Sequence, residues 1–231
     1  MKTKRLGWDS LFFNLEVAEA EISSSINLSS LQNFDLIYTK SANDFQINNK
    51  NFTVGATEEK VVFSKNLTSQ IENFKKNAPI HSVFELESYT KETLYDLAFE
   101  SGKYSRFKID TQIPEGKFEE LYRLWIDNSL NKSFADFFVV WIEETKILGF
   151  VTLKLHPTYG QIGLIAVAPN QQGKGIGTQL IKVSEEYCTQ NNIFELKIPT
   201  QKQNVEACSF YHKLGYKIVE NTYIKHAWKN V

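Results

Sequence analysis

The sequence predicts an α/β protein, in detail an α+β arrangement with a mixed sheet, and three observations lead to that fold class. Three β-rich runs with turn residues between them, at 137–142, 147–155 and 161–167, predict an antiparallel meander. Apolar residues at helical spacing precede and follow the meander, which predicts helices packed on the faces of the sheet. Alternating apolar and polar residues at 193–198 predict a further strand.

From residue 80 onward the predicted order is β-α-α-β-β-β-α-β-α-β-β. The first strand lies at 81–88, and the first helix at 90–102 begins after Thr90 and ends at Gly102. A second helix begins after Pro114 and runs to residue 130. Beyond the meander we predict a helix from 176, the strand at 193–198, a helix at 204–215 and two closing strands at 216–219 and 222–228.

A boundary at residue 79 divides the chain into a smaller amino-terminal α/β domain, 1–79, and a second domain, 80–231. The first part contains strand-like runs at 34–41 and 59–67, and 69–80 is interpreted as a short helix or linker ending at Pro79. Because so short a segment cannot easily build its own core, we expect it to pack on the rest of the chain. There it would help to shape a substrate cleft or mediate a homodimer.

Charge and hydropathy exclude several classes of function. The formal net charge is -1, from 26 basic and 27 acidic residues, which argues against a nucleic-acid or anionic-lipid surface. No window approaches the roughly 18 apolar residues of a membrane span, and polar residues interrupt the apolar stretch near the amino terminus. We therefore expect a cytoplasmic protein without a signal peptide, in which Cys188 and Cys208 stay reduced.

The segment PNQQGKGIGTQL, residues 169–180, places three glycines directly before a predicted helix. A helix leaves its first amide hydrogens unpaired, and glycines before it let backbone N–H groups converge on a phosphate. A plain glycine-rich turn is the alternative. Two familiar phosphate loops do not fit, because no glycine precedes Lys-Ser or Lys-Thr and because position 180 is leucine where a dinucleotide fingerprint needs a third glycine.

Two stretches together resemble the GNAT acyltransferase superfamily. The run from Gln172 to Gly177 is similar to that superfamily's acyl-CoA pyrophosphate loop, and 204–216 is similar to its N-x-x-A-x-x-F-Y-x-x-x-G-[FY] pattern. The resemblance implies a GNAT fold over about 80–231 and acetyl-CoA as the acyl donor. Segments at 6–17, 104–110, 124–130 and 162–166 are also similar to the dTDP-fucosamine (dTDP-4-amino-4,6-dideoxygalactose) N-acetyltransferase family.

The resemblance assigns residues to the acyl donor. Backbone groups of Ile165 and Val167 would bind the pantetheine arm, although both fit an ordinary strand core equally well. Asn204 would contact the same arm or only cap its helix, and His212 is a weaker candidate. The loop residues expected to bind the pyrophosphate are Gln172, Gly173, Lys174, Gly175, Ile176, Gly177 and Thr178.

Tyr211 is the expected general acid, because a phenol can protonate a departing thiolate. The alternative is an aromatic side chain on a buried helix face. The general base stays open, since Gln161 stands where many superfamily members carry a carboxylate. A water chain, or His156, would have to replace it.

The family resemblance also implies the acceptor, a nucleotide sugar with its own diphosphate. Arg106, in a cluster with Lys103 and Lys108, would bind that diphosphate, and Asn128 and Trp125 would line the same cleft. The expected reaction transfers acetyl to the 4-amino group of a dTDP-4-amino-4,6-dideoxyhexose, in surface polysaccharide biosynthesis, by direct attack without a metal. The alternatives are acetylation of another amine, namely a peptide amino terminus, a polyamine or an antibiotic, and a non-catalytic CoA-binding module.

Overall fold

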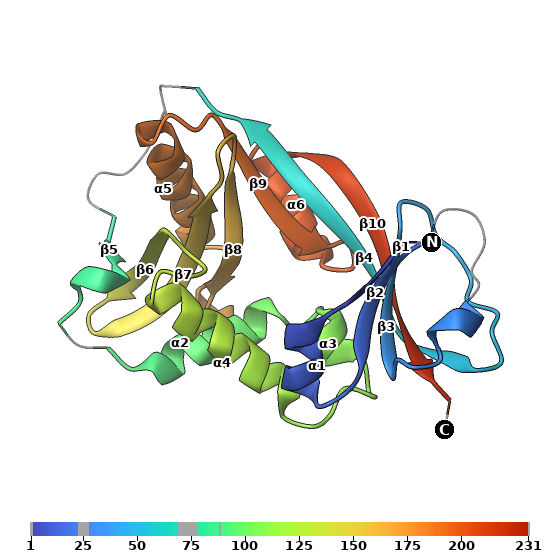
Figure 1. Ribbon diagram of the computed structural model, residues 1–231. Helices are drawn as coiled ribbons and strands as arrows, with labels where there is room; N and C mark the ends of the chain where they lie inside the picture. Colours follow the sequence, from blue (N-terminus) through green and yellow to red (C-terminus); the bar gives the residue numbers. More distant parts are fainter. Residues whose placement is uncertain (1, 23–27, 69–77, 88, 231) are drawn as a thin grey trace.

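The computed structural model describes residues 2–22, 28–68, 78–87 and 89–230, and their strands form a single mixed sheet (Figure 1). Its spatial order is β1-β2-β3-β10-β4-β9-β8-β7-β6-β5. The strands are β1 (Lys2–Arg5), β2 (Val17–Glu21), β3 (Leu36–Ser41), β4 (Phe52–Asn66), β5 (Ile80–Ser82), β6 (Phe137–Glu143), β7 (Lys146–Leu155), β8 (Gly160–Val167), β9 (Glu195–Gln201) and β10 (Lys217–Lys229).

Helices cover both faces of this sheet (Figure 1). In the orientation of Figure 1, α2 and α4 lie in front of the meander strands, whereas α5 and α6 lie behind the sheet. The helices are α1 (Gly7–Phe13), α2 (Lys91–Ser101), α3 (Arg106–Ile109), α4 (Lys117–Leu130), α5 (Ile176–Gln190) and α6 (Val205–Lys213), with short 3₁₀ turns at Leu28–Leu31, Val83–Glu85 and Pro169–Gln171.

The mixed α/β fold predicted from residue 80 onward is confirmed, with three local corrections. The two closing strands are one strand, β10, because β4 pairs with it from Lys217 to Lys229, including the polar residues Glu220 and Asn221 between the two predicted strands. The strand expected at 81–88 ends at Ser82, where a 3₁₀ turn begins. The predicted loop around Arg106 contains the one-turn helix α3, which the Ser105 side chain caps.

The amino-terminal segment contributes strands to the same sheet. β4 lies between β9 and β10, and β3 pairs with the other edge of β10. The sheet therefore continues across the expected boundary at residue 79, and that boundary stays a prediction about organisation. The helix or linker predicted at 69–80 falls largely outside the described residues.

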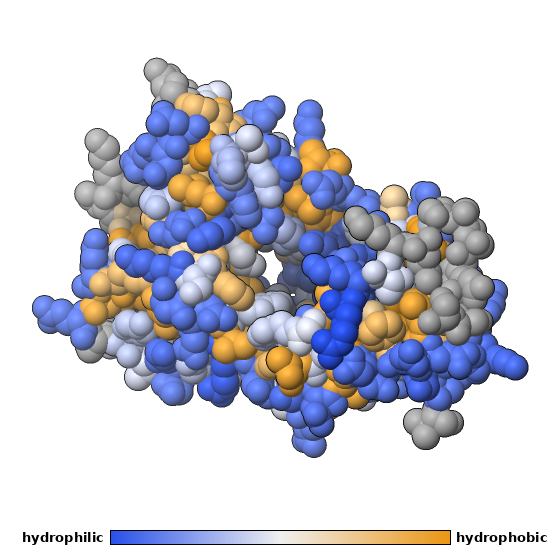
Figure 2. All heavy atoms as spheres, in the orientation of Figure 1, coloured by the Kyte–Doolittle hydropathy of each residue, from blue (hydrophilic) through white to orange (hydrophobic). Residues whose placement is uncertain are grey.

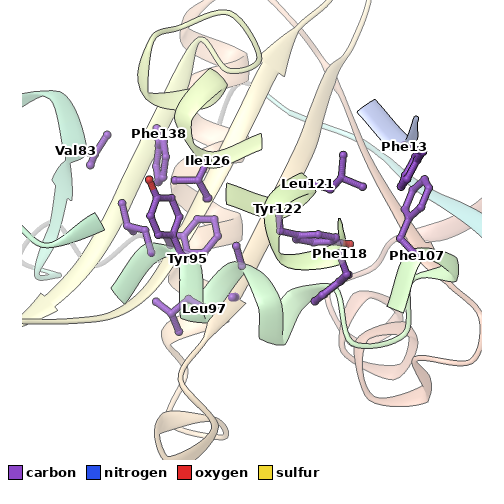
Figure 3. Close-up of a cluster of buried hydrophobic side chains, with 14 of the residues drawn as sticks. Phe13, Val83, Tyr95, Leu97, Phe107, Phe118, Leu121, Tyr122, Ile126 and Phe138 are labelled. Carbon is purple, nitrogen blue, oxygen red and sulfur yellow. The ribbon is translucent and has the colours of Figure 1, made fainter. Parts of the chain in front are cut away.

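Side-chain alternation along the meander strands supplies two hydrophobic layers. Phe138, Val140 and Phe150 face one layer, where they pack with side chains of α2 and α4 (Figure 3). Val139 and Val151 face the other layer, which α5 completes. Because both faces are packed, the position of each strand relative to the helices is tightly determined.

β8 and β9 are parallel neighbours that separate after a short contact. They pair only at Gly160 with Leu196 and at Gln161 with Lys197, among the described residues. Beyond that point the two strands diverge, as Figure 1 shows. The separation leaves the edge of β8 without a strand partner, and this opening positions the site.

Candidate active site

One cleft of about 800 Å³ lies where β8 and β9 separate. Its wall runs from the glycine loop and α6 past both strands to β4, α3 and α1. Figure 2 shows the molecule hollowed at this place, near the centre of the view. A volume of this size is typical of a small-molecule site.

The open edge of β8 presents backbone donors to the cleft. Ala168 donates its N–H to Leu148 of the neighbouring strand, and Leu164 donates to the Thr152 hydroxyl on that same side. Because the direction of N–H groups alternates along a strand, those of Ile165 and Val167 point the other way, into the cleft. Both residues line it. This geometry agrees with the expectation that their backbone, rather than their side chains, would bind a ligand.

The glycine loop holds an unusual backbone at the start of α5. Gly173 and Gly175 have φ of 77° and 88°, a region that favours glycine, and Gly175 is the residue before the helix. Gly177 lies against the Phe210 ring, where a Cβ would come within 3.2 Å of the ring and the ring would have to shift slightly. The loop residues that line the cleft are Gln172, Gly173, Gly175, Ile176, Gly177 and Thr178. Bare amides at a helix amino terminus fit a pyrophosphate.

Asn204 and Tyr211 reach the same cleft from α6. The Asn204 side chain accepts a hydrogen bond from the Ala207 N–H, so it caps the helix as well as lining the cleft. Tyr211 is buried against Phe63, and no described residue forms a hydrogen bond with its hydroxyl. Burial raises the pKa of Tyr211, so the hydroxyl keeps its proton at neutral pH.

Arg106 and Glu58 meet at the other end of the cleft. The Glu58 carboxylate is 2% exposed, accepts the backbone N–H of Arg106 at 3.1 Å and lies 3.7 Å from its guanidinium. The guanidinium lies over the Tyr38 and Phe107 rings, at 5.1 and 4.3 Å from their centroids. A buried carboxylate that faces a cleft is a candidate proton acceptor.

Below this end lies a buried polar cluster. His226 Nδ1 is 2.5 Å from Asp110 Oδ2, and Trp228 donates to the same oxygen at 2.9 Å. Burial lowers the pKa of His226, and its Nε2 has no partner among the described residues, as suits a neutral ring. The pKa of Asp110 is also lowered, because the bonds from His226 and Trp228 outweigh the opposing effect of its burial. The neutral His226 ring and the Asp110 carboxylate thus form a hydrogen-bonded pair, and His226 packs on Tyr38 and Phe107, the two rings that contact Arg106.

Five residues of the amino-terminal segment line the cleft without having been predicted: Trp8, Asp9 and Phe13 from α1, and Glu58 and Lys60 from β4. The Trp8 side chain is 51% exposed, whereas burial raises the pKa of Asp9. The i, i+2 spacing of Glu58 and Lys60 places both on one face of β4. That spacing was the feature of the sequence from which a shared position of the two side chains could have been inferred, but charged residues on a strand usually indicate a face exposed to solvent.

Several predicted residues lie elsewhere. Asn128 is near the end of α4, where its carbonyl accepts the Phe134 N–H, and it does not line the cleft. His212 is exposed and packs on Phe63, and Lys174 donates to the Gln171 side chain; neither His212 nor Lys174 lines the cleft. His156 stacks on Tyr159 in the turn after β7, outside the cleft. Lys103 and Trp125 do line it, but Lys108 does not and instead pairs with Glu119.

The cysteines and the metal-binding types do not contribute here. Burial raises the pKa of the Cys188 thiol to about 12 and also raises that of Cys208, and neither residue lines the cleft. Within the described ranges, no group of three His, Cys, Asp or Glu side chains is arranged to hold a metal. No helix in the described part of the chain is long and apolar enough to cross a membrane.

Comparison with known families gives a match to the sequence profile described as Acetyltransferase (GNAT) family, over residues 93–216. The chain is 33% identical over 76 residues to the uncharacterized protein YxbD of Bacillus subtilis, covering 33% of this chain and 46% of that protein. It is 24% identical over 155 residues to the spore coat polysaccharide biosynthesis protein SpsD of Bacillus subtilis, covering 67% and 53%.

A third relative is the spermidine N(1)-acetyltransferase of Thermoplasma acidophilum, 26% identical over 136 residues, covering 55% of this chain and 82% of that protein. The chain spans less than half the length of the first curated relatives that it matches.

Solved structures share the fold. A functionally unknown conserved protein from Staphylococcus epidermidis aligns with a TM-score of 0.66 and 13% identity, covering 94% of this chain and 85% of that one. An acetyltransferase from the GNAT family of Colwellia psychrerythraea aligns with a TM-score of 0.52 and 14% identity, covering 97% and 73%. At these identities the likeness establishes the architecture alone.

Proposed function

The chain belongs to the acetyltransferase (GNAT) family, and on that premise we propose that it transfers acetyl from acetyl-CoA to an amine of a small-molecule acceptor. The acceptor we propose is a dTDP-linked 4-amino-4,6-dideoxyhexose, acetylated on its 4-amino group. One observation carries the proposal. A single cleft connects the glycine loop, the open edge of β8 and Tyr211 at one end to Glu58 and Arg106 at the other.

The residues at the first end suit the acyl donor, which supplies a thioester when it is bound. Backbone amides at 173–178 hold its pyrophosphate at the start of α5. The N–H groups of Ile165 and Val167 hold the pantetheine arm and polarise the thioester carbonyl as negative charge develops on its oxygen. Asn204 lies where it can contact the same arm. The bare glycines and the unpaired strand edge are the features of this structure that fit such a ligand.

The residues at the second end suit an amine. Glu58 accepts the proton that the amine must lose, either directly or through one water, so that the nitrogen lone pair becomes free to attack the carbonyl carbon. As the carbon–sulfur bond breaks, Tyr211 donates its proton toward the sulfur. Neither cysteine lines the cleft, so we propose direct attack on the thioester without an acyl-enzyme.

Two relatives point to different acceptors. The similarity to the spore coat polysaccharide biosynthesis protein SpsD and the likeness to the dTDP-fucosamine N-acetyltransferases support an amino sugar. The relative named as a spermidine N(1)-acetyltransferase favours a polyamine as second candidate, and the carboxylates of Asp9 and Glu58 would suit a cation.

The test is an acetylation assay on purified protein with acetyl-CoA and a panel of amines. The panel holds a dTDP-linked 4-amino-4,6-dideoxyhexose, spermidine and a peptide with a free amino terminus, and mass spectrometry identifies each product. We expect the nucleotide sugar to gain one acetyl group and to react with the highest kcat/KM. Faster acetylation of spermidine or of the peptide contradicts the sugar assignment. Absence of acetyl-CoA binding in calorimetry contradicts the activity itself.

A further inference from the structure

Two cations at the acceptor end of the cleft lack the partners that buried cations normally have. The Arg106 side chain is 20% exposed, and it donates no hydrogen bond to any described residue. Its Nε is buried without a partner, and its contact with Glu58, at 3.7 Å, is too long for a hydrogen bond. A guanidinium carries five donors, and leaving them unsatisfied when partly buried costs free energy.

Lys60 is the second of these cations. It lines the cleft from β4, two residues after Glu58, and forms no salt bridge within the part of the chain that the structure describes. Burial lowers its pKa, and the positive charge of Arg106 lowers it further. An unpaired ammonium close to a guanidinium is unfavourable unless a ligand brings negative charge between them.

None of the neighbouring carboxylates forms a salt bridge with Lys60 among the described residues, although the charges of Glu58 and Glu220 act to raise its pKa. Glu58 accepts the Arg106 backbone N–H and lies 3.7 Å from the Arg106 guanidinium, and burial raises the pKa of Asp9. Glu100, which also lines the cleft, forms a salt bridge with Lys103. The acceptor end therefore presents one carboxylate suited to an ammonium group and two cations suited to an anion.

We propose that Lys60 and Arg106 bind a phosphate group of the acceptor, while Glu58 faces its amine. This inference rests on the proposed acetyl transfer and adds the charged groups that would select the acceptor: an amine that also carries a phosphate, as a nucleotide sugar does. Arg106 offers a planar fork for two phosphate oxygens, and Lys60 adds a point charge from the amino-terminal segment. A polyamine, which has no anion, would leave both cations unpaired.

The experiment compares acceptors with and without the nucleoside diphosphate: a dTDP-linked 4-amino-4,6-dideoxyhexose and the same free aminohexose. We expect Lys60→Gln to raise KM for the first by about tenfold, with kcat and the KM for the second within about twofold. Arg106→Lys, which keeps the charge but loses the fork, should raise the same KM. Lys146→Gln removes an exposed lysine outside the cleft and should change neither constant. Melting temperatures show that each variant is folded.

A binding measurement separates this inference from the acetyl transfer. dTDP is titrated into protein saturated with CoA, so that the loop at α5 is already occupied. The phosphate site is supported if dTDP binds the wild-type protein and if both Lys60→Gln and added salt weaken its affinity. Wild-type protein that acetylates both sugars with equal KM and binds no dTDP overturns it while leaving the acetyl transfer intact. Protein that binds dTDP but acetylates no amine contradicts the proposed function and not the phosphate site. An aminohexuronic acid preferred over the nucleotide sugar would overturn the assignment to phosphate.

Discussion

Removing the hydroxyl of Tyr211 should separate catalysis from folding, and a nearby tyrosine provides the matched control. Tyr211 and Tyr216 are both buried in the same hydrophobic cluster, with ring centroids 6.5 Å apart. Their hydroxyls differ. That of Tyr216 donates to Glu185 Oε1 at 2.7 Å, whereas that of Tyr211 has no hydrogen-bond partner among the described residues. Tyr211→Phe and Tyr216→Phe therefore remove the same atom from different roles.

The structure sets the expected magnitudes. Tyr211→Phe breaks no hydrogen bond in the described protein, so the free energy of unfolding should change by no more than about 0.5 kcal/mol. If its proton goes to the departing sulfur, kcat should fall by roughly 10²- to 10⁴-fold. Tyr216→Phe breaks a buried bond to a carboxylate, which is worth about 1.5–3 kcal/mol. For a chain of this size that loss lowers Tm by roughly 3–12 °C.

Three measurements distinguish the two variants. Thermal unfolding gives Tm, calorimetry gives the Kd for acetyl-CoA, and steady-state kinetics at saturating acetyl-CoA give kcat. We expect Tyr211→Phe to keep its Tm and Kd and to lose kcat, and Tyr216→Phe to lose Tm and keep kcat at a temperature where it is folded. A Tyr211→Phe variant with unchanged kcat would refute the acid role. A large drop in its Tm would instead mean that the hydroxyl supports the fold.

Three further predictions follow from the same geometry. Glu58→Gln keeps an oxygen that can accept the Arg106 N–H but cannot act as a base, so kcat/KM should fall by roughly 10²-fold or more. The neighbouring Glu59 does not line the cleft, so Glu59→Gln should leave kcat/KM unchanged. Gly175→Ala should lower the free energy of unfolding by about 1–2 kcal/mol, because the residue has a φ of 88° and the added Cβ meets no neighbouring atom. The same variant should bind acetyl-CoA more weakly in calorimetry. Gly116→Ala is the control: its φ is 77° before α4, so it should lose similar stability but no affinity for acetyl-CoA. Burial holds the pKa of His226 below its usual 6.5 in the folded protein. As the pH falls through about 6.5, His226 therefore binds a proton in the unfolded chain but not in the folded chain, which favours unfolding. Tm should therefore drop between about pH 7 and about pH 5, and a smaller drop in His226→Gln is the check; equal slopes in both proteins would contradict this assignment.

Much of the donor end could be predicted from local sequence. These features are the loop from Gln172 to Thr178, the helix cap at Asn204 and the position of Tyr211 beside the same cleft. Each depends on short spacings along one helix or turn. Such features are determined by backbone conformation and by contacts three or four residues apart. For the same reason the order of strands and helices from residue 80 was recovered almost completely. The early end of β5 and the short helix α3 were missed, and β10 was divided in two because its pairing partners are distant in the sequence.

The residues at the acceptor end of the cleft could be identified only from the tertiary structure. Lys60 pairs in register with Gln201, so a strand near the start of the chain lies beside one near its end. No residue pattern near Glu58 or Lys60 indicates that β4 lies between β9 and β10. Asn128, which the sequence analysis assigned to the cleft, lies on a part of α4 outside it. The sequence by itself therefore determined the elements and the backbone conformation of the glycine loop before α5. Which charged side chains share a cleft was decided by packing, since strand neighbours are chosen by the whole hydrophobic core and not by the residues beside them.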